Sequence, residues 1–207
     1  ICDESLARMV KHAGETGIDL PDRQLACARL NSPRGRDYLA AMACAANYAW
    51  ANRQMLMHRT RETFERTLGM GPRELGMRLL YDVCHNIAKI ETLPVEGQEV
   101  RLCVHRKGAT RALPPDHAAV PPAYRKSGQP VLIPGDMGTG SYVLAGTQKA
   151  FTETFGSTCH GAGRVMSRTQ AVKSCRGRSI PREMADRGVI VMSSGKGMLM
   201  EEIPEAY

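Results

Sequence analysis

The chain has 207 residues, of which 43% are hydrophobic and 24% are charged, and its formal net charge at pH 7 is +7. This length is sufficient for one sizeable hydrophobic core or two small lobes. No run of about 18 apolar residues occurs, so no transmembrane helix is expected, and no secretory signal opens the chain. The seven cysteines show no paired CxxC spacing, which favours reduced thiols and a cytoplasmic location over a disulfide framework.

Helical patterns dominate the first third of the chain. Apolar residues at three- and four-residue spacing predict a helix over residues 3–13 and a much longer one over residues 36–68, which Gly69 ends. The apolar run 24–30 is consistent with a short strand, and residues 79–83 are predicted to form another.

The later part of the chain shifts toward strands. Short strands are predicted at residues 90–95, 99–104, 131–133, 141–144 and 189–192, the first pair forming a hairpin. Short helices are predicted at 147–154 and 179–188. Residues 106–129 are rich in Pro, Gly and charge and are predicted to form a long functional loop. We therefore expect an α+β fold with mixed β-sheets flanked by helices.

The positive charge is concentrated in two stretches. Residues 101–126 hold six basic residues against one acid, and residues 164–187 hold seven against two. A basic surface is often only a solvated face, but here both stretches lie in or beside glycine-rich motifs. This arrangement favours a polyanionic partner, a nucleotide together with nucleic acid.

The stretch FGSTCHGAGR at residues 155–164 carries the most specific chemical signal. It places His160 before a Gly-Ala-Gly turn and close to Arg164. Glycines let the backbone approach a ligand and offer N–H groups to anions, and arginine adds a fork for phosphate. A neutral imidazole in this setting can attack phosphorus. A lone His-Gly pair, in contrast, is more commonly a histidine satisfied by the backbone of a loop.

Three further stretches share this character: YDVCHNIAK at 81–89, VHRKGATR at 104–111 and PGDMGTGSY at 134–142. Together the four motifs closely resemble the RtcB-type RNA-splicing ligases over nearly the whole chain. The resemblance implies an RtcB-like fold, with residues 1–207 forming the central-to-C-terminal part of a single catalytic domain.

This resemblance implies a GTP- and manganese-dependent RNA ligase of tRNA splicing and RNA repair. Such enzymes join RNA 3′-phosphate or 2′,3′-cyclic phosphate ends to 5′-hydroxyl ends, and some need the activator protein archease. His160 is implied as the nucleophile that attacks the α-phosphorus of GTP, expels pyrophosphate and holds GMP. The implied nucleotide contacts are His85, Asn86, Pro134, Gly135, Asp136, Met137, Ser141, His160, Gly161, Ala162 and Gly163.

Four cations are candidates for gripping RNA phosphates: Arg164, Arg168, Lys107 and Arg111. Arg164 and Arg168 lie four residues apart and share a face if a helix begins after Gly163. Lys107 and Arg111, taken alone, equally fit ordinary solvated charges. In the string AANYAWANR at 45–53, the small alanines favour close packing of the helix on another layer. The alternative is that Asn47, Asn52 and Arg53 support the site from behind.

His85 follows a predicted strand, and local sequence fits either a capping histidine or a ligand. The resemblance makes it a manganese ligand, since imidazole suits such a cation. The family supplies the remaining ligands from a region upstream of Ile1, and a guanine-contacting lysine from beyond Tyr207. The chain also lacks an initiator methionine, so we expect a fragment that is inactive alone.

Alternatives remain open at the level of the sequence. The glycines of residues 134–141 also fit a tight connection between strands, and the loop matches neither the Walker A nor the GxGxxG pattern. Asp136 departs from the small residue expected in the family. The competing functions are a catalytically inactive nucleotide- or RNA-binding fragment and a metal-dependent phosphohydrolase that uses His85 but needs no nucleophilic His160.

Overall fold

A computed structural model describes residues 2–161, 163–193 and 196–207. The chain divides into two compact units, Ile1–Ala88 and Lys89–Tyr207. Among the described residues, no helix is both long enough and apolar enough to cross a membrane.

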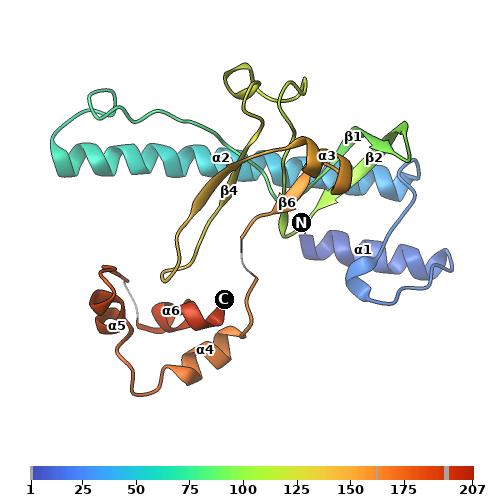
Figure 1. The fold of residues 1–207 in the computed structure, drawn as a ribbon. Coiled ribbons are helices and arrows are strands. Elements are labelled where there is room, and N and C mark those ends of the chain that lie inside the picture. Colours follow the sequence, from blue (N-terminus) through green and yellow to red (C-terminus); the bar gives the residue numbers. More distant parts are fainter. Residues whose placement is uncertain (1, 162, 194–195) are drawn as a thin grey trace. The chain divides into compact units, whose positions relative to one another are not determined.

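The first unit is built on two helices (Figure 1). Helix α1 spans Cys2–Glu15 and helix α2 spans Pro33–Leu68, which confirms both predicted helices. Met9 and Ala13 of α1 are buried at 7% and 0% exposure, and α1 contacts α2. Ser32 caps α2 by accepting a hydrogen bond from the Gly35 N–H at 3.0 Å, and the helix ends at Gly69 in the left-handed conformation.

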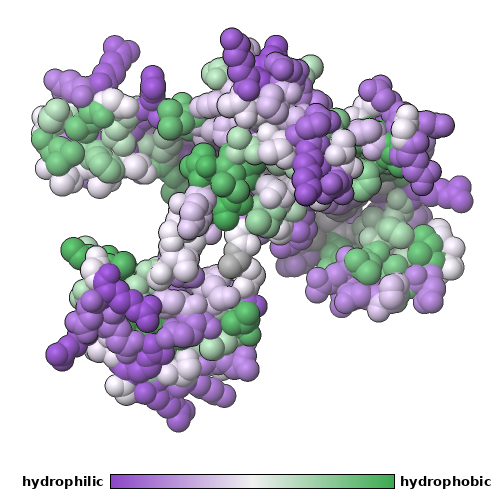
Figure 2. All heavy atoms as spheres, viewed as in Figure 1, coloured by the Kyte–Doolittle hydropathy of each residue, from purple (hydrophilic) through white to green (hydrophobic). Residues whose placement is uncertain are grey.

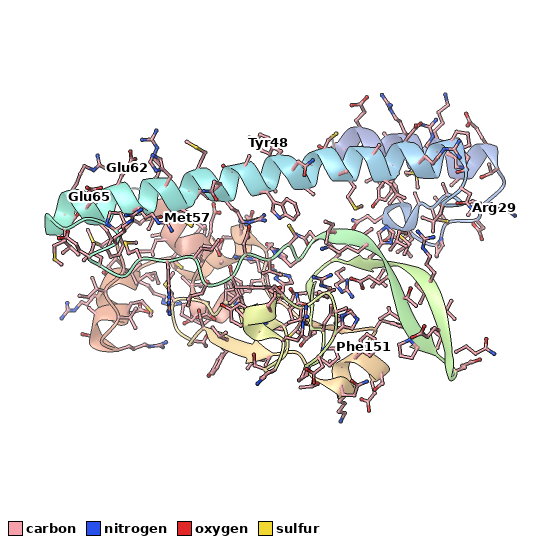
Figure 3. All side chains as sticks on the ribbon, turned by 90° about the horizontal axis from the view of Figure 1, so that it is seen from above. Arg29, Tyr48, Met57, Glu62, Glu65 and Phe151 are labelled. Atoms are coloured by element: carbon pink, nitrogen blue, oxygen red, sulfur yellow. The ribbon has the colours of Figure 1, made fainter. Side chains whose placement is uncertain are left out.

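After α2 the chain returns along the same helix (Figures 1 and 3). Three contacts hold the returning segment. Arg61 donates to the carbonyl oxygen of Met77, Arg53 pairs with Asp82, and the N–H of Ala88 lies 3.0 Å from Sδ of Met42. The predicted strand at 79–83 is wrong, because these residues form no regular secondary structure. Side chains of α2 hold the segment in place of a ladder.

The predicted strand at 24–30 is also wrong. Its first residues belong to a short 3-10 helix, Arg23–Leu25, which Asp22 caps through Gln24, and the remainder is irregular. Leu25 and Leu30 are 61% and 41% exposed. Without burial on one face, an apolar run of this length has no reason to adopt the strand period.

The second unit opens with the predicted hairpin, formed by β1, Ile87–Val95, and β2, Gln98–Arg106. Its two-residue turn, Glu96 and Gly97, has positive φ at both positions, as hairpins of this length require. Strand β1 begins just before the boundary between the units.

Two further strand pairs follow. Strand β3, Ala109–Arg111, pairs antiparallel with β6, Ser157–Cys159, and β4, Pro130–Ile133, pairs antiparallel with β5, Tyr142–Ala145. A 3-10 helix, Pro122–Tyr124, lies between β3 and β4 in the sequence, and helix α3, Gln148–Glu153, lies between β5 and β6. The α+β class is confirmed. Among the described residues, each sheet has two strands. The β3–β6 and β4–β5 pairs are antiparallel, whereas mixed sheets were expected.

The C-terminal part of this unit is helical (Figure 1). It contains α4, Arg168–Ser174, α5, Ile180–Asp186, α6, Lys196–Glu201, and the 3-10 helix Pro204–Ala206. Its buried core consists of Ala171, Cys175, Ile180, Met184, Ile203 and Ala206. The predicted strand at 189–192 is wrong: these residues are irregular, and Ile190 and Met192 are 88% and 91% exposed.

Candidate functional site

His160 directly follows strand β6 and is half-buried. The antiparallel pairing of Ala109 with Cys159 places this strand end beside the turn that joins β2 to β3. A Cβ carbon built at Gly108 in that turn would lie 3.8 Å from Nε2 of His160. The imidazole therefore lies against the turn that carries Lys107 and Gly108.

The glycine-rich loop at 134–141 is the connection of the β4–β5 hairpin. Its N–H groups are partly engaged within the loop: that of Gly135 donates to Oγ of Ser141 at 3.1 Å, and that of Asp136 donates to Oγ1 of Thr139 at 3.2 Å. Asp136 in turn accepts a hydrogen bond from the N–H of Gly138. The unexpected carboxylate thus closes a local turn of the type that Asp forms readily.

The two glycine-rich loops lie against each other. A Cβ carbon at Gly161 would lie 3.1 Å from the carbonyl oxygen of Pro134, and the φ of Gly161 is +148°. A Cβ at Gly135 would lie 2.4 Å from the carbonyl oxygen of Gly140, so only glycine fits there. Three of the sequence motifs therefore meet at one place in the second unit, around His160.

The positions of Gly163, Ala162 and Met137, which are also predicted to bind nucleotide, do not add to this arrangement around His160. Gly163 is exposed, and Ala162 lies outside the described residues. Met137 is half-buried and packs against the core of the C-terminal helices, so at least part of its side chain has a structural role.

His85 and Asn86 belong to the first unit, and both are exposed. The residues just before them are fixed by Arg53 of α2. Its Nε and Nη2 donate to the two carboxylate oxygens of Asp82 at 2.6 and 3.1 Å, and Nη2 lies 3.4 Å from Sγ of Cys84. The position suggested for Arg53, behind the His-Asn motif, agrees with this contact.

The described residues do not form a metal site. They contain no group of three or more His, Cys, Asp and Glu side chains that could hold a metal ion. His85 is one imidazole, and one ligand does not fix a divalent cation.

Arg164 and Arg168 are engaged in ion pairs within the second unit. Arg164 lies 3.1 Å from Glu202 and stacks over the ring of Tyr207 at 5.0 Å, while Arg168 lies 3.3 Å from Glu201. The hydroxyl of Tyr207 donates to Glu202, which raises the pKa of Tyr207. The side chain of Arg168 remains 66% exposed and that of Arg164 only 21%, so Arg168 has far more surface to offer a phosphate.

Lys107 and Arg111 also differ in how far their side chains are exposed. Lys107 is exposed beside His160. The side chain of Arg111 is 19% exposed, and its guanidinium donates to Gln129 at 3.1 Å and to Glu91 at 3.4 Å. These internal contacts favour a structural role for Arg111, which differs from both expectations from the sequence, an RNA contact and a solvated surface charge.

Sequence reasoning missed Arg106. Its side chain is 1% exposed and bridges Glu91, Ser157 and the carbonyl oxygen of Phe155. In the sequence it is one of several basic residues between 101 and 126. The available signals were its place in the 104–111 motif and at the end of a predicted strand, beside a glycine turn.

Comparison with known proteins agrees with this arrangement of motifs. The family profile described as tRNA-splicing ligase RtcB matches residues 1–207. The chain is 54% identical over 207 residues to the tRNA-splicing ligase RtcB of Archaeoglobus fulgidus, covering 100% of this chain and 43% of that protein. It is 54% identical to the protein of the same name from Methanocaldococcus jannaschii and 51% identical to that from Methanococcus maripaludis, each over 207 residues.

All of this chain is matched in these relatives, but it covers 21% of the M. jannaschii protein and 43% of the M. maripaludis protein. The chain thus spans less than half the length of the relatives described. Since the family profile extends over every residue and about half of the residues are identical in each relative, the chain belongs to the RtcB family of tRNA-splicing ligases.

Proposed function

We propose that this chain carries the nucleotide-transfer centre of an RNA ligase that uses GTP and joins RNA 3′-phosphate or 2′,3′-cyclic phosphate ends to 5′-hydroxyl ends. The observation that carries the proposal is the meeting of three motifs around His160: the Lys107–Gly108 turn and the two glycine-rich loops. A half-buried imidazole that the backbone approaches closely on several sides is a setting in which a histidine can act as a nucleophile on a bound nucleotide.

The chemistry follows from the imidazole. A ring nitrogen of neutral His160 attacks the α-phosphorus of GTP, a P–N bond forms, and the bond to pyrophosphate breaks. An oxygen of the RNA 3′-phosphate then attacks the same phosphorus, which returns the electron pair to the imidazole and leaves the RNA end activated by GMP. Attack by a 5′-hydroxyl on that end forms the new phosphodiester and releases GMP.

Residues around the imidazole have distinct roles in this proposal. One glycine-rich loop is proposed to line the nucleotide with Pro134, Gly135, Asp136, Met137 and Ser141. The other is proposed to line it with Gly161, Ala162 and Gly163. Lys107 and Arg168 are the accessible cations for RNA phosphates. Asn86 is a further proposed contact of the nucleotide.

Manganese is implied for the family, and His85 is the ligand that the family resemblance assigns among the described residues. The donor set of the described residues does not fit a complete site, so no step is assigned to the metal. We expect the 207 residues alone to be inactive in ligation, and the further ligands to come from elsewhere in a protein of the relatives' length. Cytoplasmic location, cleaved tRNA or other broken RNA as substrate, and an archease-type activator belong to the same proposal.

The test uses labelled GTP and a protein of the relatives' length that contains these residues. We expect a GMP adduct that is labile to acid and hydroxylamine, and His160→Ala is expected to abolish it. His58→Ala, which changes an exposed histidine of α2, is the matched control and should retain the adduct. An adduct of unchanged yield in His160→Ala would refute the assignment, while release of phosphate from GTP without any adduct would support the phosphohydrolase alternative.

A further inference from the structure

The side chain of Arg106 is the most completely buried cation among the residues that the structure describes as ion-paired. It stands at the end of β2, with 1% of its side chain exposed, and faces Glu91 of β1, which is 13% exposed. Nη1 and Nη2 donate to the two carboxylate oxygens of Glu91 at 3.2 and 2.6 Å. This is a bidentate, fork-to-fork pair, the strongest geometry available to these groups.

The same guanidinium also holds strand β6. Its Nε donates to Oγ of Ser157 at 2.9 Å, and Nη2 donates to the carbonyl oxygen of Phe155 at 3.0 Å. Ser157 is the first residue of β6, and His160 follows the last. One rigid planar group therefore ties β1 to the strand that ends at the nucleophile.

Stability alone does not account for this arrangement. Removing two charges from water costs most of what their attraction returns, and well-packed apolar side chains often serve equally well or better. Apolar packing cannot fix the relative orientation of the strands through directional hydrogen bonds. A guanidinium fixes several acceptors at defined angles in one plane, and here those acceptors belong to β1, to β6 and to the turn before β6.

Arg106 also constrains the other side of the imidazole. Lys107 and Gly108 follow it directly, and a Cβ carbon at Gly108 would lie 3.8 Å from Nε2 of His160. The pairing of Arg111 with Ser157 and of Ala109 with Cys159 closes the loop between the two sides. The start of the turn that touches the ring and the strand that carries the ring are therefore anchored to one buried group.

We propose that Arg106, held by Glu91, is a positioning residue that sets the orientation of His160 for attack on the nucleotide. The inference rests on the proposed function of His160. Arg106 is buried and fully engaged with Glu91, Ser157 and Phe155, so it acts through β6 and the adjoining turn and does not touch the nucleotide. Misplacing a nucleophile by a fraction of its contact distance slows the chemical step while leaving substrate binding largely intact.

The experiment measures single-turnover formation of the GMP adduct across a range of GTP concentrations, in a protein of the relatives' length. Arg106→Lys keeps the charge but loses the fork, and we expect the maximal rate to fall about 100-fold with little change in the GTP concentration for half-maximal rate. Ser157→Ala removes one hydrogen bond to β6 and is expected to lower the maximal rate by a smaller factor. Arg101→Lys, an exposed position on the same strand, should retain the parent rate.

The thermal unfolding curve of Arg106→Lys shows whether this variant folds. If it does not fold, Ser157→Ala still tests the inference. The inference is overturned if folded Arg106→Lys and Ser157→Ala form the adduct at the parent rate, or if only the half-maximal GTP concentration changes. An adduct that persists in His160→Ala would instead defeat the proposed function itself, so the two failures are distinguishable.

Discussion

At the scale of single residues, Arg53 shows how a helix can fix a segment that has no secondary structure of its own. Residues 77–86 are irregular, yet the carboxylate of Asp82 receives two hydrogen bonds from the Arg53 guanidinium. Arg and carboxylate meet here in the planar geometry that Arg is suited to. The contact fixes the backbone three residues before His85.

We expect Arg53→Lys to loosen this segment without unfolding the protein. The side chains of Arg53 and Asp82 are 32% and 39% exposed, so solvent screening limits the loss of unfolding free energy to about 1 kcal/mol or less. Local opening should nevertheless become easier, and hydrogen exchange of the amides of residues 82–86 should accelerate. Arg59→Lys, which changes a pair with Glu62 on the same helix, is the control. Unchanged exchange at 82–86 would show that Arg53 does not hold the segment.

The site could be predicted from sequence only where the chemistry is local. His160 and the glycines around it stand in contiguous motifs, and the structure places them together. Arg106 and Arg111 also lie in a contiguous motif, at 104–111, but neither that motif nor a count of charges shows which cations find a buried carboxylate. Glu91, which pairs with both, lies in a predicted strand and carries no motif. Long-range pairing of this kind is decided by tertiary packing.

At the scale of elements, short helices in the second unit depend on their caps. Helix α4 has seven residues, too few for stability on propensity alone. A capping box supports it: Oγ of Ser167 accepts from the N–H of Gln170 at 3.2 Å, and the Gln170 side chain accepts from the N–H of Ser167 at 3.0 Å. Ala171 on this helix is fully buried in the core of the C-terminal helices.

Ser167→Ala is expected to lower the free energy of unfolding by about 1 kcal/mol, because the N–H of Gln170 loses its partner. Urea denaturation followed by circular dichroism measures the change. The matched control is Thr169→Ala, an exposed position in the first turn of the same helix, for which we expect a much smaller effect. Equal losses in the two variants would mean that the box does not stabilise α4.

Helices α1, α2, α3 and α5 were predicted from sequence, α4 and α6 were not, and three of the predicted short strands were wrong. The long helix carried both a periodic pattern and end signals, Ser32 with Pro33 at its start and Gly69 at its end. The runs 24–30, 79–83 and 189–192 offered apolar character alone, and much of it is exposed, for example at Leu80 and Ile190. An apolar run of a few residues becomes a strand only when a neighbouring strand accepts its hydrogen bonds.

Exposed apolar side chains also occur on α2. Tyr48 and Trp50 are 76% and 48% exposed, and Figure 2 shows apolar surface near the C-terminal end of the helix, where Phe64, Leu68 and Met70 lie. A helix that is not covered on these positions owes its stability to its caps and to the returning segment. The chain spans less than half of its relatives, which agrees with a long helix that has more surface than these residues can cover.

At the scale of the whole molecule, the 28 Lys and Arg side chains are not equally available to a polyanion such as the proposed RNA. Five arginines are paired internally with five carboxylates: Arg106 and Arg111 share Glu91, Arg164 and Arg168 face Glu201 and Glu202, and Arg178 pairs with Glu183 and Glu205. These groups cancel one another, so the formal net charge of +7 is carried by the remaining side chains. The hydrogen bond from Arg178 lowers the pKa of Glu183, which keeps that pair charged. Binding of a polyanion then depends on the cations without such partners.

Substitutions at Lys107 and Arg111 test whether only cations without an internal ion pair contribute to RNA binding. Lys107→Gln and Arg111→Gln each remove one positive charge from the same stretch of sequence. In a protein of the relatives' length, Lys107→Gln is expected to reduce the slope of log affinity for single-stranded RNA against log salt concentration by about 0.7–1, the loss of one phosphate contact. Arg111→Gln should leave the slope nearly unchanged, because its guanidinium is bound to Glu91 and Gln129, and should instead lower the unfolding temperature. Filter binding at a series of salt concentrations gives both slopes. If Arg111→Gln reduced the slope and Lys107→Gln did not, the internal pairing of Arg111 would not describe the protein that binds RNA.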